Sequence, residues 1–120
     1  MDIRIDTHHV ELSGTGPATI AQRASRILGR FRDGIARTGL TLRRERGSRG
    51  GESNVCVLRV DLAAGGQIVV VDRSRSLKRA IVRCLRRGRS VLARELKRRR
   101  GVQRRRLATR TAPRDLALQP

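Results

Sequence analysis

The sequence predicts an α+β domain with the order β-α-β-β-β-α, in which a four-stranded sheet carries two helices packed on one face. Apolar residues recur at helical spacing over 18–31 and 77–100, and shorter stretches between and before them alternate as strands do. Both helices have one apolar side, and a sheet with one free apolar face can cover both sides at once. A chain of 120 residues is long enough for one such domain. We assign it to residues 1–100 and expect residues 101–120 to be a basic, disordered tail.

The first strand is predicted at MDIRIDT, where Ile3 and Ile5 alternate with polar neighbours. The segment SGTGP then interrupts the pattern. Thr15 or Gly16 can cap the helix that follows, with Pro17 at its first position, where the missing N–H of proline costs nothing.

The first helix is predicted from Ala18 to Phe31, and Asp33-Gly34 ends it. Its apolar residues fall on one side. Three arginines fall together on the opposite side, three and four positions apart: Arg23, Arg26 and Arg30.

Three strands are predicted between the two helices. Residues 35–45 contain the alternating Leu40-Thr41-Leu42-Arg43, and residues 56–62 alternate most clearly. Between these two strands, RGSRGGES reads as a glycine-rich loop. Ala63-Ala64-Gly65-Gly66 is typical of a hairpin turn, and residues 67–72 form the strand after it.

The second helix is predicted at LKRAIVRCLRRGRSVLARELKRRR, residues 77–100, with Ser74 or Ser76 as its cap. Its apolar residues share slightly under half of the circumference. Gly88 lies among them and costs about 1 kcal/mol relative to alanine in an open helix, unless it permits close packing on the sheet. Glu95 also falls on the apolar side. The rest of the circumference is mainly basic: Lys78, Arg79, Arg83, Arg86, Arg87, Arg89, Arg94, Lys97 and Arg98.

The charge of the chain indicates a polyanionic partner. Lys and Arg number 29 against 10 Asp and Glu, a net charge of +19, and about half of this excess lies in residues 77–100. Like charges three or four residues apart destabilise a helix by about 0.2–0.5 kcal/mol per pair, and phosphates relieve that repulsion. A solubility surface is the alternative. A membrane surface is disfavoured because the sheet already covers the apolar side of the helix.

The scarcity of aromatic residues narrows the kind of nucleic acid. The chain has one Phe and neither Tyr nor Trp, so it lacks the platforms on which single-stranded bases usually stack. We therefore expect recognition through phosphates and overall shape, which favours a folded RNA or a duplex.

Four segments and their order resemble the ribosome hibernation-promoting factor family, which includes the ribosome-associated inhibitor and the sigma-54 modulation proteins. The likeness spans roughly residues 1–98 and is carried by His9-Val10-Glu11-Leu12, Arg30-Phe31-Arg32-Asp33-Gly34-Ile35, Cys56-Val57-Leu58-Arg59-Val60, and Ser76 through Ala80-Ile81 into a long basic helix. The resemblance implies a non-catalytic cytoplasmic protein that binds the small ribosomal subunit and the whole ribosome through rRNA. It implies that the protein occupies the channel of messenger and transfer RNA, blocks translation and protects idle ribosomes.

The resemblance also implies which residues contact RNA, because the contacts of the family come largely from basic residues on the two helices. Carried over to this sequence and completed from the same basic arc, the predicted RNA-binding residues are Arg23, Arg26, Arg30, Lys78, Arg79, Arg83, Arg86, Arg87, Arg94, Lys97 and Arg98. The chain departs from the family in its scarcity of acids and of Tyr. Its length matches the short type, without a C-terminal dimerising domain, so we expect a monomer off the ribosome.

Two other functions stay open. One is a nucleic-acid-coating architectural protein with no preference for ribosomes. The other is a ribosome-rescue hydrolase, because Gly65-Gly66-Gln67 spells the tripeptide of peptidyl-tRNA hydrolases and release factors. The tripeptide leads straight into a strand, however, so a hairpin turn is the favoured interpretation.

No catalytic residue, metal or cofactor is assigned. His8-His9 has no acidic or cysteine cluster beside it at ligand spacing, and no Ser-His-acid or Cys-His constellation is found. Cys56 and Cys84 are expected to be small buried hydrophobes in a reducing cytoplasm, and not a disulfide scaffold. Neither a transmembrane segment nor a signal peptide is predicted, and no small-molecule substrate is expected.

Overall fold

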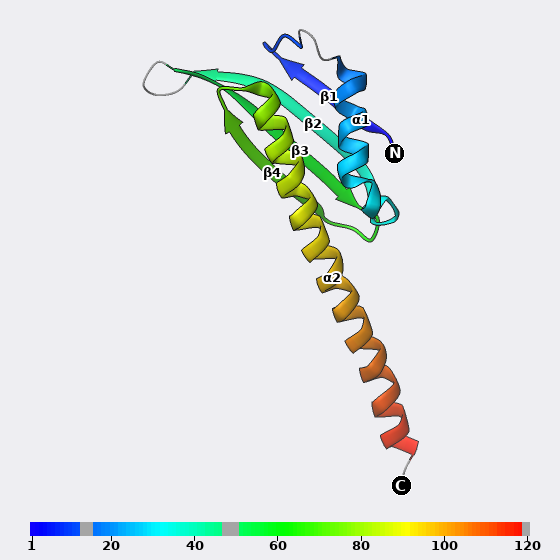
Figure 1. The fold of residues 1–120 in the computed structure, drawn as a ribbon. Helices are drawn as coiled ribbons and strands as arrows, with labels where there is room; N and C mark the ends of the chain where they lie inside the picture. The colour runs from blue at the N-terminus through cyan, green and yellow to red at the C-terminus, as the bar shows by residue number, and fades with distance from the viewer. Residues whose placement is uncertain (13–15, 47–50, 119–120) are drawn as a thin grey trace.

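The computed structural model of the chain describes residues 1–12, 16–46 and 51–118, and Figure 1 shows its fold. A short 3₁₀ helix, η1, follows the first α-helix. The elements in chain order are β1 (Ile3–His8), α1 (Pro17–Leu28), η1 (Gly29–Gly34), β2 (Ile35–Arg46), β3 (Glu52–Leu62), β4 (Gln67–Ser74) and α2 (Leu77–Leu118). The predicted order β-α-β-β-β-α is confirmed.

The four strands form one mixed sheet in the order β1-β2-β3-β4. β1 pairs with β2 in parallel, because α1 carries the chain back to the end where β1 started, and the other two pairings are antiparallel. The register places Leu40 of β2 between Ile5 of β1 and Leu58 of β3, and Leu58 next to Val70 of β4. One face of the sheet is therefore apolar across all four strands at this level.

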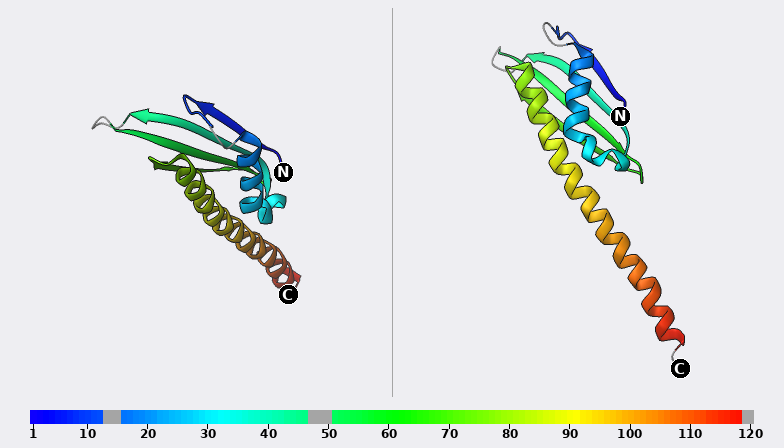
Figure 2. Two further views of the ribbon diagram at one scale, coloured as in Figure 1. Left: turned by 45° about the horizontal axis from the view of Figure 1, so that its top comes forward. Right: turned by 45° about the vertical axis from the view of Figure 1, so that its right-hand side comes forward.

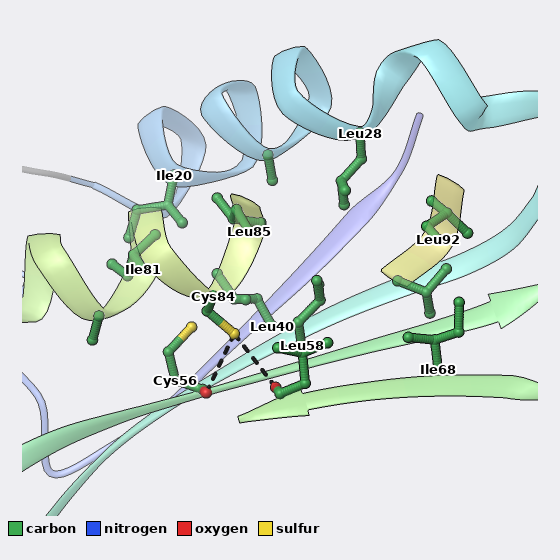
Figure 3. Packing of buried hydrophobic residues seen from close by; sticks show 14 of the residues in the cluster. Ile20, Leu28, Leu40, Cys56, Leu58, Ile68, Ile81, Cys84, Leu85 and Leu92 are labelled. Carbon is green, nitrogen blue, oxygen red and sulfur yellow. Dashed lines mark hydrogen bonds between the residues drawn. The ribbon is translucent and has the colours of Figure 1, made fainter. Parts of the chain in front are cut away.

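Both helices cover this apolar face and run in the same direction, α1 over β1 and α2 over β3 and β4 (Figures 1 and 2). Their apolar sides meet the sheet in a single core. Figure 3 shows Leu28 of α1 and Leu85 and Leu92 of α2 above the strands, and each of these leucines is fully buried. The predicted packing of two helices on one face is confirmed.

Local sequence signals explain where several elements begin. The Ser76 hydroxyl accepts a hydrogen bond from the backbone N–H of Arg79 at 3.3 Å, which makes Ser76 the cap of α2. Gly16 occupies the cap position of α1 with Pro17 first in the helix, whereas Thr15 lies outside the described residues. Gly65 and Gly66 turn the β3–β4 hairpin with φ of 97° and 91°, which glycine adopts without strain.

Two helix ends differ from the sequence-based expectation. α1 ends at Leu28, and η1 continues it through residues 29–34. α2 does not stop at Arg100 but continues to Leu118, through the segment expected to be a disordered tail. Residues 102–112 are rich in Arg, Gln, Leu and Ala, which favour helix, and α2 enters them already formed, so no new nucleation is needed.

The two cysteines lie together in the core, on β3 and α2. Both are free and fully buried. The Cys84 thiol lies 3.4 Å from the carbonyl oxygens of Cys56 and Val70 and can donate to either, as the dashed lines in Figure 3 mark. The prediction that both are small buried residues is confirmed.

Candidate nucleic-acid interface

The eleven predicted RNA-binding residues are all exposed and come from α1, from η1 that continues it, and from α2. We call them the helix-face cations: Arg23 and Arg26 of α1, Arg30 of η1, and Lys78, Arg79, Arg83, Arg86, Arg87, Arg94, Lys97 and Arg98 of α2. Within the described residues, only Arg83, Arg87 and Arg98 of this set form an ion pair with a carboxylate. Most of the positive charge on this side is therefore not neutralised by the protein itself.

The opposite face of the sheet has a different charge pattern. Strand alternation puts Asp6 and Asp61 on it, because their neighbours Ile5, Val60 and Leu62 face the helices. Glu45 lies on it as well, because it is three positions from the buried Leu42. The Arg4 Nε atom lies 3.2 Å from a carboxylate oxygen of Asp6. The carboxylate oxygens of Glu45 lie 3.0 Å from Arg43 Nε and 3.5 Å from Arg73 Nη2. Acids and bases are mixed on this face, whereas the helix side is predominantly cationic.

A cleft joins the beginnings of the two helices. It has a volume of about 310 Å³, and its lining includes Arg23 of α1 and Lys78 of α2 above the apolar side chains of Ile20 and Ile81. Glu11, before α1, also borders it. The structure therefore brings basic residues of both helices to one depression, which supports a shared cationic surface.

Two further depressions follow the helices. One, of about 490 Å³, lies on α2 itself, between Lys78, Arg79, Arg83 and Arg86. Another of about 490 Å³ is lined by Arg30 of η1 and by Arg99 and Arg100 of α2. Arg30 also lies over the ring of Phe31, 5.8 Å from its centroid.

Asp72 reduces the charge of the surface at one point. Its side chain on β4 is only 5% exposed. Its carboxylate oxygens lie 3.8 Å from Arg83 Nη2 and 3.5 Å from Arg87 Nη1. Arg87 also donates to the backbone carbonyl of Val71 at 2.9 Å. Because β4 is an edge strand, this contact satisfies an acceptor that would otherwise be open to another strand. Arg87 thus has a structural role that sequence reasoning did not identify.

Glu95 forms two ion pairs within α2, with Arg98 and Arg99. Its carboxylate accepts hydrogen bonds from Arg98 at 2.7 Å and from Arg99 at 2.9 Å, and these two guanidinium groups lower the pKa of Glu95 to about 2. Arg99 also donates to the carbonyl of Gly65 in the β3–β4 turn at 2.5 Å. Arg99 was not among the predicted residues, although its spacing of four from Glu95 is a recognisable signal.

The Gly65-Gly66-Gln67 tripeptide lies in the β3–β4 hairpin, and Gln67 is exposed there. Gln67 begins β4, and its side-chain amide donates to Asp61 at 2.9 Å. The prediction of a hairpin turn is confirmed. In the described parts of the chain, no three His, Cys, Asp or Glu side chains gather as a metal site would require, and no helix is long and apolar enough to cross a membrane.

Comparison with known proteins identifies the fold. No model of a known protein family matches the chain, and neither does any curated protein sequence. Among solved structures, a ribosomal subunit interface protein from Coxiella burnetii superimposes with a TM-score of 0.62 at 16% identity, over 81% of this chain and 99% of that one. The N-terminal domain of Protein Y from Thermus thermophilus gives 0.59 at 21% identity, over 78% and 98% of the two chains. The chain therefore has the fold of these two proteins, which is the fold that its resemblance to the hibernation-promoting factor family predicts.

Proposed function

We propose that this chain is a non-catalytic, ribosome-binding inhibitor of translation. It places the helix-face cations on rRNA of the small subunit, in the channel that messenger and transfer RNA use, and so keeps both out. Off the ribosome it is a monomer in the cytoplasm. It needs no cofactor, because its action is to occupy a site.

The observation that carries this proposal is the segregation of charge. Cations from two helices lie on one side, eight of them without an ion pair among the described residues, and the open sheet face mixes both signs. In the free protein, repulsion between these like charges is unfavourable. Phosphate oxygens that approach the surface relieve that repulsion, which favours binding. Guanidinium groups suit this contact because they bind phosphate through two parallel hydrogen bonds.

The two solved structures with the same fold also support the proposed function. One of them is described as a ribosomal subunit interface protein, and this chain covers 99% of its length. The shared fold supplies the same two-helix layer in which this chain places its cations. Phosphate-directed binding without aromatic stacking also suits an rRNA channel, where the backbone is already folded.

Sedimentation tests the proposal directly. Purified small subunits are mixed with the protein and centrifuged through a sucrose cushion at increasing salt. We expect the protein to pellet with the subunits at low salt and to be released steeply as salt rises, because several phosphate contacts are lost together. Addition of the protein to a cell-free translation reaction should stop synthesis at a stoichiometry near one per ribosome.

A charge-matched pair of variants locates the surface. Arg79→Gln with Arg86→Gln removes two helix-face cations that form no ion pair within the described residues, and we expect weaker subunit binding and weaker inhibition. Arg37→Gln with Arg59→Gln removes the same charge from exposed positions on the other face of the sheet. Equal loss in both double variants, or equal affinity for any nucleic acid of the same length, would indicate an architectural nucleic-acid-coating protein instead.

A further inference from the structure

α2 projects well beyond the body of the protein. Figures 1 and 2 show its second half leaving the sheet with no other element beside it. The part after Arg100 runs to Leu118, which at ~1.5 Å per residue is about 27 Å of helix. We call residues 101–118 the α2 arm. The arm belongs to the same uninterrupted helix as the helix-face cations, so its direction is fixed relative to them.

The arm continues the line of the basic face. Arg104 follows Arg86 by about five full turns at ~3.6 residues per turn, so both side chains leave the helix in the same direction. Arg105 stands in the same relation to Arg87. Arg104 and Arg105 are both exposed, and they lie about 27 Å further along the axis than their counterparts.

The charge of this region is of one sign. Between Leu96 and Ala108 every charged residue is basic: Lys97, Arg98, Arg99, Arg100, Arg104, Arg105 and Arg106. Arg100 and Arg104 are four residues apart, a like-charge pair that disfavours the helix unless an anion lies nearby. Among the arm side chains that the structure describes, residues 101–108, Leu107 is the large apolar one that is exposed, at 55%, and one such side chain is too little apolar surface for a protein–protein interface.

We propose that the α2 arm is a second RNA-binding element, in which Arg104 and Arg105 contact the phosphates of a duplex segment beyond the one under the body. The partner is the backbone of double-stranded RNA, because the arm offers a straight row of guanidinium groups and no aromatic residue for reading bases. The proposal rests on the proposed function only in taking RNA as the partner. It extends the binding surface past the last predicted residue, Arg98.

The salt dependence of binding to a naked RNA duplex tests the arm. Each phosphate contact contributes about 0.7–0.9 to the slope of log affinity against log salt concentration. We expect Arg104→Gln with Arg105→Gln to reduce that slope by about 1.4–1.8, and Arg104→Lys with Arg105→Lys to restore it, because the charges return. The charge-matched control is Arg37→Gln with Arg59→Gln. A slope equal to that of this control would overturn the proposal.

Two further measurements separate the possible failures. Far-UV circular dichroism must show that the glutamine variant keeps its helix, which is expected because glutamine is a good helix former. If polyglutamate displaces the duplex from the arm as well as polyphosphate does, the arm binds acidic polymers in general and the RNA assignment is wrong. If the arm variant alters duplex binding while the unaltered protein ignores ribosomal subunits, the proposed function fails and the arm proposal stands.

Discussion

Gly88 of α2 packs directly on Leu58 of β3, so closely that a Cβ atom at position 88 would overlap the Leu58 Cδ2 methyl group. Leu58 is fully buried at the centre of the sheet. The glycine that weakens α2 as an isolated helix therefore allows it to lie close to the sheet. The helix-face cations on the far side of α2 depend on this contact for their position.

Replacement of Gly88 by Ala should destabilise the fold. Overpacking of a core costs about 1–3 kcal/mol, whereas the gain in helix propensity is about 0.8–1.0 kcal/mol. We expect a net loss of about 1 kcal/mol in the free energy of unfolding, measured with urea. Gly101→Ala is the control, because nothing lies within 4 Å of a Cβ there, and it should increase helicity. A gain in stability for both variants would contradict the close packing.

A double variant isolates the contact itself. Leu58→Ala alone should cost about 2–5 kcal/mol because it leaves a cavity in the core. In that background, Gly88→Ala should no longer destabilise, since its methyl group enters the vacated space. Additive losses in the thermodynamic cycle would show that Gly88 and Leu58 do not meet.

Replacement of Asp72 by Asn should separate stability from RNA binding. The buried carboxylate holds Arg83 and Arg87, so its neutralisation should lower the free energy of unfolding by about 1 kcal/mol. The same change frees two helix-face cations and should tighten binding to an RNA duplex. Asp61→Asn makes an equal change in net charge on the other face of the sheet and should leave RNA affinity nearly unaltered. Weaker RNA binding by Asp72→Asn would contradict the assignment of Arg83 and Arg87 to the interface.

The Glu95 ion pairs should make stability sensitive to acid. Arg98 and then Arg99 lower the pKa of Glu95 from 4.5 to about 2. Because the carboxylate is charged in the folded state at lower pH than in the unfolded state, the pairs stabilise fully above pH 4.5 and lose that effect as pH falls towards 2. The melting temperatures of the protein and of Glu95→Gln should differ at pH 6 and converge near pH 2. A constant difference across that range would show that the pairs do not form.

The two cysteines should resist thiol reagents in the folded protein. The neighbouring Cys84 thiol and burial raise the pKa of Cys56, and neither side chain is exposed to solvent. We expect Ellman's reagent at pH 8 to react only as fast as the protein unfolds, and rapidly in urea. Fast reaction without denaturant would show that α2 detaches readily from β3.

The sequence alone determined the order of the strands and α-helices and the chemical character of each side of the helices. The alternation in 56–62, the cap at Ser76 and the turn at Gly65-Gly66 all act over a few residues, so the chain itself contains the signal. The exposed positions of the basic arc follow from the apolar stripe on the other side. The pairing of Glu95 with Arg98 and Arg99 was also available from spacing, although it was not predicted.

Only the tertiary structure decided which of these cations are held by the protein. Asp72 and Arg87 are distant in sequence, and they meet because α2 crosses β4 at that point. The same packing brings Arg23 and Lys78 to one cleft and fixes Arg99 on the β3–β4 turn. The length of α2 was likewise not evident from periodicity, because the apolar residues of the sequence lose their helical spacing after Arg100. Contacts between remote segments depend on how the helices lie on the sheet, which local spacing does not specify.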